Sequence, residues 1–257
     1  MRRFSRLHRI RMYLDFSNLQ IALMALIFAW TAFVRSGIGF GGIALGMPFM
    51  LLVHDEAMFW LPIFGTHLLF FSAITLRKRF RAVDWRYLQQ ISVYILPAAL
   101  LGIFSLLTLP NHYIITFIYC FSIFYAFTWL AKWKVNSRQG WLDKFLLGFG
   151  GYIIGSGMPG MPLISSVVIR FVSLENLRNT LFVLISTLTI IRMGTFVAVE
   201  VNMHFLFALC LIPTAWIGHH FGMRAHDAII NNQALFKKVI GTMLILVSSL
   251  GLLKVYL

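Results

Sequence analysis

A hydrophobic segment broken by glycine and proline occurs twice in this chain. The first copy, GIGFGGIALGMPFMLL, spans residues 37–52, and the second, GYIIGSGMPGMPLISS, spans residues 151–166. At an offset of 114 residues, Pro48 aligns with Pro162. Glycine and proline both interrupt helices, and inside a bilayer the backbone groups that they free must face protein or a polar cavity. Matching breaks in two halves predict the substrate site of a secondary transporter.

A helix that stops and restarts in the membrane presents unpaired N–H groups at its new N-terminus, where the helix dipole is positive. Glycine lets an anion approach that backbone, so the two breaks predict a cradle for a sulfonate or carboxylate group. Pro48 and Pro162 suit the first turns of the restarted helices. The predicted substrate-binding residues are Gly37, Gly39, Gly41, Gly42, Gly46, Pro48, Gly151, Gly155, Gly157, Pro159, Gly160 and Pro162 from the breaks, with Thr66 and Asn179 from the following spans.

The glycines also have a second explanation, which is close packing of helices. Gly37 and Gly41 have GxxxG spacing, and so do Gly151 and Gly155. Such spacing lets two membrane helices approach closely without any ligand. The proline at the end of each run favours breaks over packing alone.

Two side chains near the breaks carry charge or can take up a proton. Arg35 precedes the first break and either supplies positive charge to an anion or extends to the membrane surface. His67 lies in a predicted span and either couples transport to protons or hydrogen-bonds to a neighbouring helix. No group of His, Asp and Glu has the spacing of a metal site, and no cofactor is expected.

The composition places these segments in a membrane. Hydrophobic residues make up 60% of the chain, charged residues make up 12%, and mean hydropathy is +0.83, whereas a soluble domain carries about a quarter charged residues. Apolar stretches of about 20 residues, enough to cross a bilayer, predict spans at 57–76, 86–108, 112–131, 176–191, 203–222 and 237–256. The sequence does not decide whether the broken segments 19–53 and 142–172 each cross once or re-enter.

The net charge of +14 is arranged as in membrane proteins. Basic clusters occupy the region around 77–86 and the linker 134–141, while the turns at 54–57 and 109–112 are poor in Lys and Arg. Positive loops on one side of a membrane predict lipid as the partner and argue against nucleic acid. Residues 1–18, which are also basic, are predicted to form an interfacial segment on the inner side.

The repeat extends well beyond the glycines. Aligned pairs include Thr66 with Thr180, Ser72 with Ser186, Asp84 with Glu200, Pro97 with Pro213 and Gly102 with Gly218. The alignment predicts an all-α membrane bundle of two four-crossing units, at 19–133 and 142–257, joined by the linker 134–141. An even number of crossings predicts parallel repeats, related by an axis along the membrane normal, with both termini cytoplasmic.

The two motifs together resemble a known family. GIGFGGIALGMP and GSGMPGMP, with the basic edge RKRFRAVDW at 77–85, are similar in order and spacing to the sulfite exporter TauE/SafE family of anion transporters. The resemblance covers the chain from about residue 19 to 256. It implies movement of sulfite, sulfonates or related organic anions across a bacterial cytoplasmic membrane, usually outward.

The function expected from the residues is therefore a secondary transporter that holds a small anion between the two units. Nothing matches GxxxxGK[ST], so the chain is not expected to hydrolyse ATP, and no enzyme activity is expected. An anion channel that uses the same helix ends is an alternative, and so is a non-transporting membrane subunit. The sequence identifies neither the anion nor the coupling ion, and it leaves a homo-oligomer open.

Overall fold

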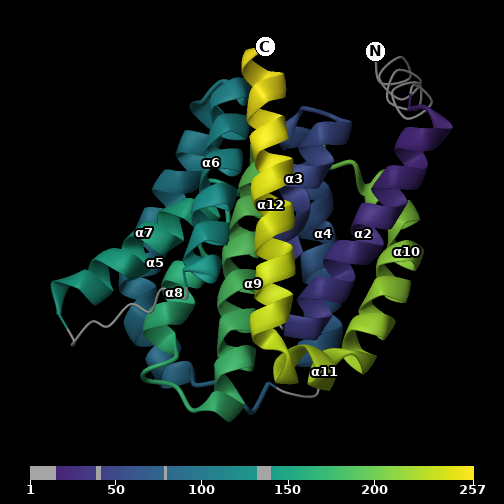
Figure 1. Cartoon of the computed structure of the whole chain (residues 1–257). Coiled ribbons are helices and arrows are strands. Elements are labelled where there is room, and N and C mark those ends of the chain that lie inside the picture. Colours follow the sequence, from purple (N-terminus) through teal and green to yellow (C-terminus); the bar gives the residue numbers. More distant parts are fainter. Residues whose placement is uncertain (1–15, 39–41, 78–79, 132–139) are drawn as a thin grey trace.

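The computed structural model describes residues 16–38, 42–77, 80–131 and 140–257, which form a bundle of α-helices (Figure 1). Seven helices in these ranges are long and apolar enough to cross a membrane. They are α2 (Asn18–Ile38), α4 (Ala57–Leu76), α5 (Trp85–Thr108), α6 (Asn111–Leu130), α9 (Leu174–Ala198), α10 (Phe205–Arg224) and α12 (Gln233–Tyr256). The shorter helices are α3 (Gly42–Val53), α7 (Trp141–Gly155), α8 (Met161–Val168) and α11 (His226–Asn231). The all-α membrane bundle is thus confirmed. Residues 1–15 of the predicted interfacial segment lie outside the described ranges.

The first broken segment folds as a hairpin of two antiparallel helices. At one end, the Gln20 side chain in α2 donates a hydrogen bond to the carbonyl oxygen of Val53 in α3, at 3.4 Å. At the other end, Gly42 at the start of α3 lies against Arg35 in the last turn of α2. Because α3 begins at Gly42, Pro48 lies inside this helix. The prediction of Pro48 in a first turn is therefore wrong.

The second broken segment is also a hairpin, and its turn shows why α7 stops. The N–H groups of Gly157 and Met158 donate to the carbonyls of Ile154 and Ile153, at 3.0 and 2.9 Å. This pattern closes a helix end when the residue after the cap is left-handed, and Gly157 has φ +80°. Pro162 then lies in the first turn of α8, as predicted.

An ion pair closes the open end of the second hairpin. The Arg170 guanidinium, just after α8, donates to the Asp143 carboxylate in the first turn of α7, at 2.6 Å. The chain therefore enters and leaves this hairpin at the same face of the bundle. Both broken segments therefore turn back, and each one begins and ends at the same end of the bundle.

Aligned helices of the two repeats point in opposite directions. The helices α4 and α9, which correspond in sequence, run antiparallel: Gly65 packs on Met193, and the N–H of Asp84, after α4, donates to the hydroxyl of Thr180, early in α9, at 3.0 Å. In Figure 1, α4 descends while α9 rises. The predicted parallel arrangement is therefore wrong, and the repeats are inverted. Each hairpin returns to its own face before three further spans, so each repeat starts and ends on opposite faces.

The two repeats interlock through glycine contacts. A side chain at Gly218 of α10 would overlap the carbonyl of Ala29 in α2, and one at Gly155 of α7 would overlap the carbonyl of Ala99 in α5. Small residues allow such close backbone approach between membrane helices. Each hairpin is thereby packed on a spanning helix of the other repeat.

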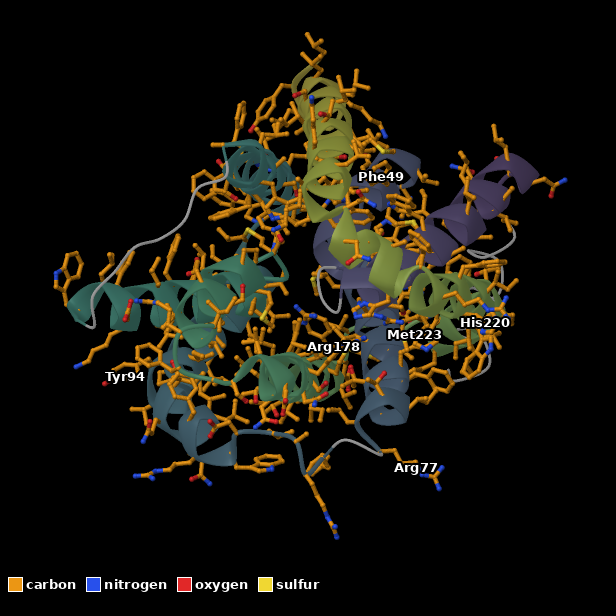
Figure 2. All side chains as sticks on the ribbon, turned by 60° about the horizontal axis from the view of Figure 1, so that its bottom comes forward. Phe49, Arg77, Tyr94, Arg178, His220 and Met223 are labelled. Atoms are coloured by element: carbon orange, nitrogen blue, oxygen red, sulfur yellow. The ribbon has the colours of Figure 1, made fainter. Side chains whose placement is uncertain are left out.

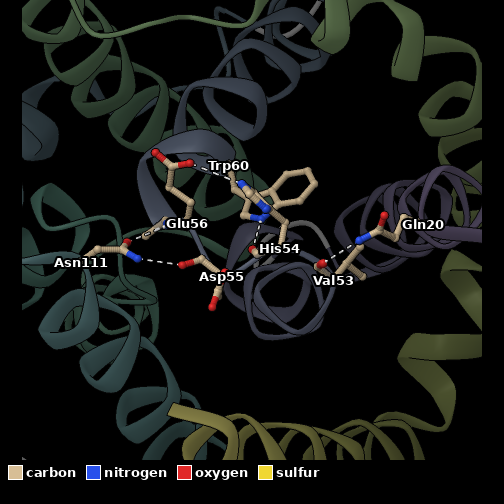
Figure 3. Close-up of polar contacts among 8 residues, drawn as sticks. Gln20, Val53, His54, Asp55, Glu56, Trp60 and Asn111 are labelled. Carbon is tan, nitrogen blue, oxygen red and sulfur yellow. Dashed lines mark hydrogen bonds and ion pairs between the residues drawn. The ribbon is translucent and has the colours of Figure 1, made fainter. Parts of the chain in front are cut away.

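The turn between α3 and α4 is held by side-chain hydrogen bonds (Figure 3). Asn111, at the start of α6, donates to the carbonyl of Asp55 at 2.7 Å and accepts from the N–H of Ala57 at 3.1 Å. The Trp60 indole donates to the carbonyl of His54 at 2.8 Å. These bonds tie the open end of the first hairpin to α6.

The two ends of the bundle differ in the sign of most of their described charged side chains, although Asp84, Asp143 and Glu175 lie at the basic end. The basic end carries Arg77, Arg170, Arg178 and Arg224, whereas the acidic end carries Asp55, Glu56 and Glu200. Figure 2 views the basic end, with Arg77 projecting from the rim. The start of α2 and the end of α12 lie at the acidic end, where Lys254 Nζ contacts the carbonyl of Leu52 at 3.5 Å. This differs from the prediction that the termini share the basic face, because that prediction counted each broken segment as one crossing.

Candidate functional site

A cavity lies where the two hairpins meet the long helices α4 and α9. Its volume is about 70 Å³, whereas about 10–15 Å³ is enough for one water molecule, so the space suits a small solute. Much of the wall is apolar, with Phe28, Phe64, Leu181 and Phe182 among the lining side chains. The polar groups are few, and they determine what the cavity can bind.

Two arginines line the cavity, one from each repeat. The guanidinium of Arg35, from α2, lies over the ring of Phe71 at 4.4 Å from its centroid. Arg192, from α9, is only 4% exposed, and its Nη1 donates to the carbonyl of Ile154 at the end of α7, at 3.1 Å. In both, a buried guanidinium nitrogen has no hydrogen-bond partner among the described residues: Nη2 of Arg35 and Nε of Arg192.

No carboxylate of the described ranges neutralises these two charges. The ion pairs found there join His54 to Glu56 and Asp143 to Arg170, and no Asp or Glu is among the residues that line the cavity. A buried charge without a partner is costly, by several kcal/mol. Two such charges beside one cavity favour a bound anion, which would supply the missing partner to both.

The turn of the second hairpin forms another wall of the cavity. Gly157, Pro159 and Gly160 line it, together with the first residue of α8. Few free N–H groups are available there, since Pro162 has none and the N–H of Leu163 bonds to the carbonyl of Gly160 at 3.1 Å. The positive character of the cavity therefore comes mainly from guanidinium groups, and less from bare amides than the sequence predicted.

Comparison with known proteins agrees with this picture. A family model described as sulfite exporter TauE/SafE matches residues 23–250. The chain belongs to the TauE/SafE family. No curated protein and no solved structure matches it. The match confirms the resemblance seen in the motifs. It makes the chain an integral membrane protein of a family of anion transporters, which agrees with a function other than catalysis.

The structure brings some of the predicted site residues of this TauE/SafE protein to the cavity. Those that line it are Arg35, Gly42, His67, Gly157, Pro159 and Gly160. They come from α2, α3, α4 and the turn of the second hairpin. The described ends of both broken segments therefore meet at one place, and Gly39 and Gly41 lie outside the described residues.

Other predicted site residues lie away from the lining and have packing contacts. Gly37 packs on Ile229 of α11, Gly46 on Thr31, and Gly151 and Gly155 on the backbone of α5. Thr66 donates to the carbonyl of Pro62 in its own helix, at 2.9 Å. The remaining members of this group are Pro48, Pro162 and Asn179, of which Asn179 is buried and only 4% exposed. Close packing, the second explanation considered for the glycines, therefore accounts for Gly151 and Gly155.

Arg192 is the cavity residue that the sequence reasoning missed. The predicted span ended at residue 191, so Arg192 lay just outside it. In the structure of this chain α9 continues to Ala198, and Arg192 is enclosed by the bundle. A charged residue followed by a further apolar stretch, MGTFVAV, was the available signal.

Proposed function

We propose that this chain is a secondary transporter for a small oxyanion, such as sulfite or an organosulfonate, and that it exports this anion. The observation that carries the proposal is the pair Arg35 and Arg192, which line one cavity between the two repeats without a carboxylate partner among the described residues. Guanidinium groups bind the oxygens of sulfonates and carboxylates through directed, charge-assisted hydrogen bonds.

A mechanism follows from where Arg192 is held. Its guanidinium bonds to the end of α7 through the carbonyl of Ile154, and the residue lines the cavity. An anion bound there would be shared between a long helix and a hairpin turn. Since inverted repeats exchange equivalent conformations, tilting of the hairpins against α4 and α9 would open the site to each side in turn.

The membrane potential favours the proposed direction. An anion that leaves an inside-negative cell gains about 2.3 kcal/mol per charge for each 100 mV. Export therefore needs no ATP hydrolysis by this chain. Export is driven by the membrane potential together with the concentration gradient of the anion.

The transport experiment uses purified protein in proteoliposomes. We expect saturable counterflow of labelled sulfite. Unlabelled sulfonates should compete with sulfite for transport, whereas chloride should compete poorly. Protein-free vesicles are the control. Unitary currents in a planar bilayer would instead identify an anion channel, and the absence of flux for sulfite, sulfonates and carboxylates would support a non-transporting subunit.

We also propose that the basic end of the bundle faces the cytoplasm of a bacterial cell, because positively charged loops are retained inside. The start of α2 and the end of α12 then face outward. Cys120 and Cys210 are exposed and are first replaced by alanine. A membrane-impermeant maleimide should then label Glu56→Cys in intact cells, and Arg77→Cys only after permeabilisation. The reverse result would invert the proposed orientation.

A further inference from the structure

His67 differs from the two arginines of the cavity because it can accept a hydrogen bond, while the hydroxyls of Thr31 and Thr189, which also line the cavity, donate to carbonyls of their own helices. The two arginines only donate. His67 lies on α4, lines the cavity, and is 3% exposed. Its ring packs beside Phe28, with 4.7 Å between centroids. The site therefore combines two strong donors with one further polar ring.

The hydrogen bond between the His67 ring and a backbone carbonyl determines which ring nitrogen can accept a further hydrogen bond. Nε2 of His67 lies 2.7 Å from the carbonyl oxygen of Ala208 on α10. A carbonyl oxygen only accepts, so Nε2 carries the hydrogen. In the neutral ring Nδ1 then has a free lone pair. Within the described ranges, Nδ1 is buried and has no hydrogen-bond partner.

The surroundings favour the neutral ring. Arg35 from α2 and Arg192 from α9 line the same cavity, and the lining contains no Asp or Glu among the residues described. A third positive charge in this place would be repelled by the two guanidinium groups. Nδ1 of His67 is therefore a buried hydrogen-bond acceptor with no donor among the described residues.

We propose that His67 selects anions that carry an O–H group beside their charged oxygens. The anionic oxygens would accept from Arg35 and Arg192, and the hydroxyl would donate to Nδ1 of His67. An anion without a hydroxyl leaves this buried acceptor unpaired, which costs about 1–3 kcal/mol. This inference rests on the proposed transport function and narrows its substrate class. The hydroxyl has two chemical sources, the acid group of a singly protonated oxyanion and a carbon-bound alcohol.

The test uses pairs of anions that differ only by O–H in place of CH₃. Bicarbonate with acetate tests an acid hydroxyl, and isethionate with 1-propanesulfonate tests an alcohol. Each compound competes against labelled sulfite in counterflow. In the wild-type protein we expect the hydroxyl member of at least one pair to compete about tenfold better, as expected for pairing one buried acceptor. The pair that shows the preference identifies the source.

Matched variants separate His67 from other histidines. His67→Phe removes the acceptor, so the two anions of each pair should compete against labelled sulfite about equally well. His219→Phe should retain the wild-type ratio, because His219 is a span residue outside the cavity lining, bonded to Ser36 at 2.5 Å. His67→Gln, which keeps a donor and an acceptor, should recover part of the preference.

The outcomes distinguish the two proposals. Sulfite counterflow with equal competition within both pairs overturns the role of His67 and leaves the transport function standing. A preference that persists in His67→Phe also overturns it. If wild-type protein moves no anion, the transport function fails and the selectivity fails with it. If His67→Phe does not fold, equal competition within both pairs in the wild-type protein still overturns the role of His67, and an undiminished preference in His67→Gln does so as well.

Discussion

Arg192→Met is expected to lower sulfite counterflow by about 10- to 100-fold, because a charge-assisted hydrogen bond to the anion is worth about 1.5–3 kcal/mol. The residue is buried in the wall of the cavity, and its Nε has no partner in the described part of the chain. Methionine has a similar length and no charge, so the variant removes the guanidinium and keeps most of the volume. Counterflow in proteoliposomes measures the effect.

Stability provides the second readout for this variant. Removing a buried charge that lacks an ionic partner also removes its desolvation cost. The melting temperature of Arg192→Met in detergent should therefore stay near the wild-type value or rise, while transport falls. A residue with only a structural role would show the opposite pattern, with transport falling together with stability.

Two further variants control for charge and position. Arg77→Met removes an exposed arginine at the basic end of the bundle, and its counterflow should remain within about twofold of wild type, as expected for a screened surface charge. Arg192→Lys keeps the charge but loses the planar guanidinium group, so its counterflow should lie between those of Arg192→Met and Arg77→Met. Equal transport by Arg192→Met and Arg77→Met would remove Arg192 from the site.

The length of apolar segments was enough to predict the spanning helices. Predicted spans at 57–76, 86–108 and 112–131 agree with α4, α5 and α6 to within a residue at each end. The reason is physical, since a bilayer requires about 20 apolar residues in a helix whatever its neighbours are. The position of the second break, at 156–160, was also predictable, because glycine and proline act locally.

The direction of the repeats was not predictable by the same means. A break tells where a helix stops, and it does not tell whether the next helix continues or turns back. The helices α3 and α8, of 12 and 8 residues, are apolar in either case. A helix that turns back after the break, instead of continuing, changes the number of crossings in its repeat by one. The predicted orientation of the whole second repeat was inverted for this reason.

The candidate site was partly predictable for a related reason. Gly155 and Gly157 are two residues apart, and the sequence gives both the same role. In the structure Gly155 ends α7 and faces α5, whereas Gly157 forms the turn and lines the cavity. Which side of a helix end faces a ligand depends on tertiary packing, and no pattern of small residues contains that information.

Gly155→Ala is expected to destabilise the protein strongly for so small a change. An added Cβ would overlap the carbonyl oxygen of Ala99 on α5, and backbone atoms cannot move aside without displacing a helix. Overpacking of this kind costs about 1–3 kcal/mol. The shift would also displace the hairpin turn beside Arg192. We therefore expect a melting temperature in detergent lower by about 5 °C or more, together with reduced counterflow.

Gly194→Ala is the matched control for this substitution. Gly194 lies inside α9, and an added Cβ there meets no atom of the described structure within 4 Å. Alanine is a better helix former than glycine by about 1 kcal/mol, so the melting temperature should stay constant or rise slightly. The two variants make the same chemical change and differ only in the space that receives it. Equal melting temperatures would show that α7 does not pack on α5 as closely as the structure places it, and the hairpin would then lack the fixed position that the anion site requires.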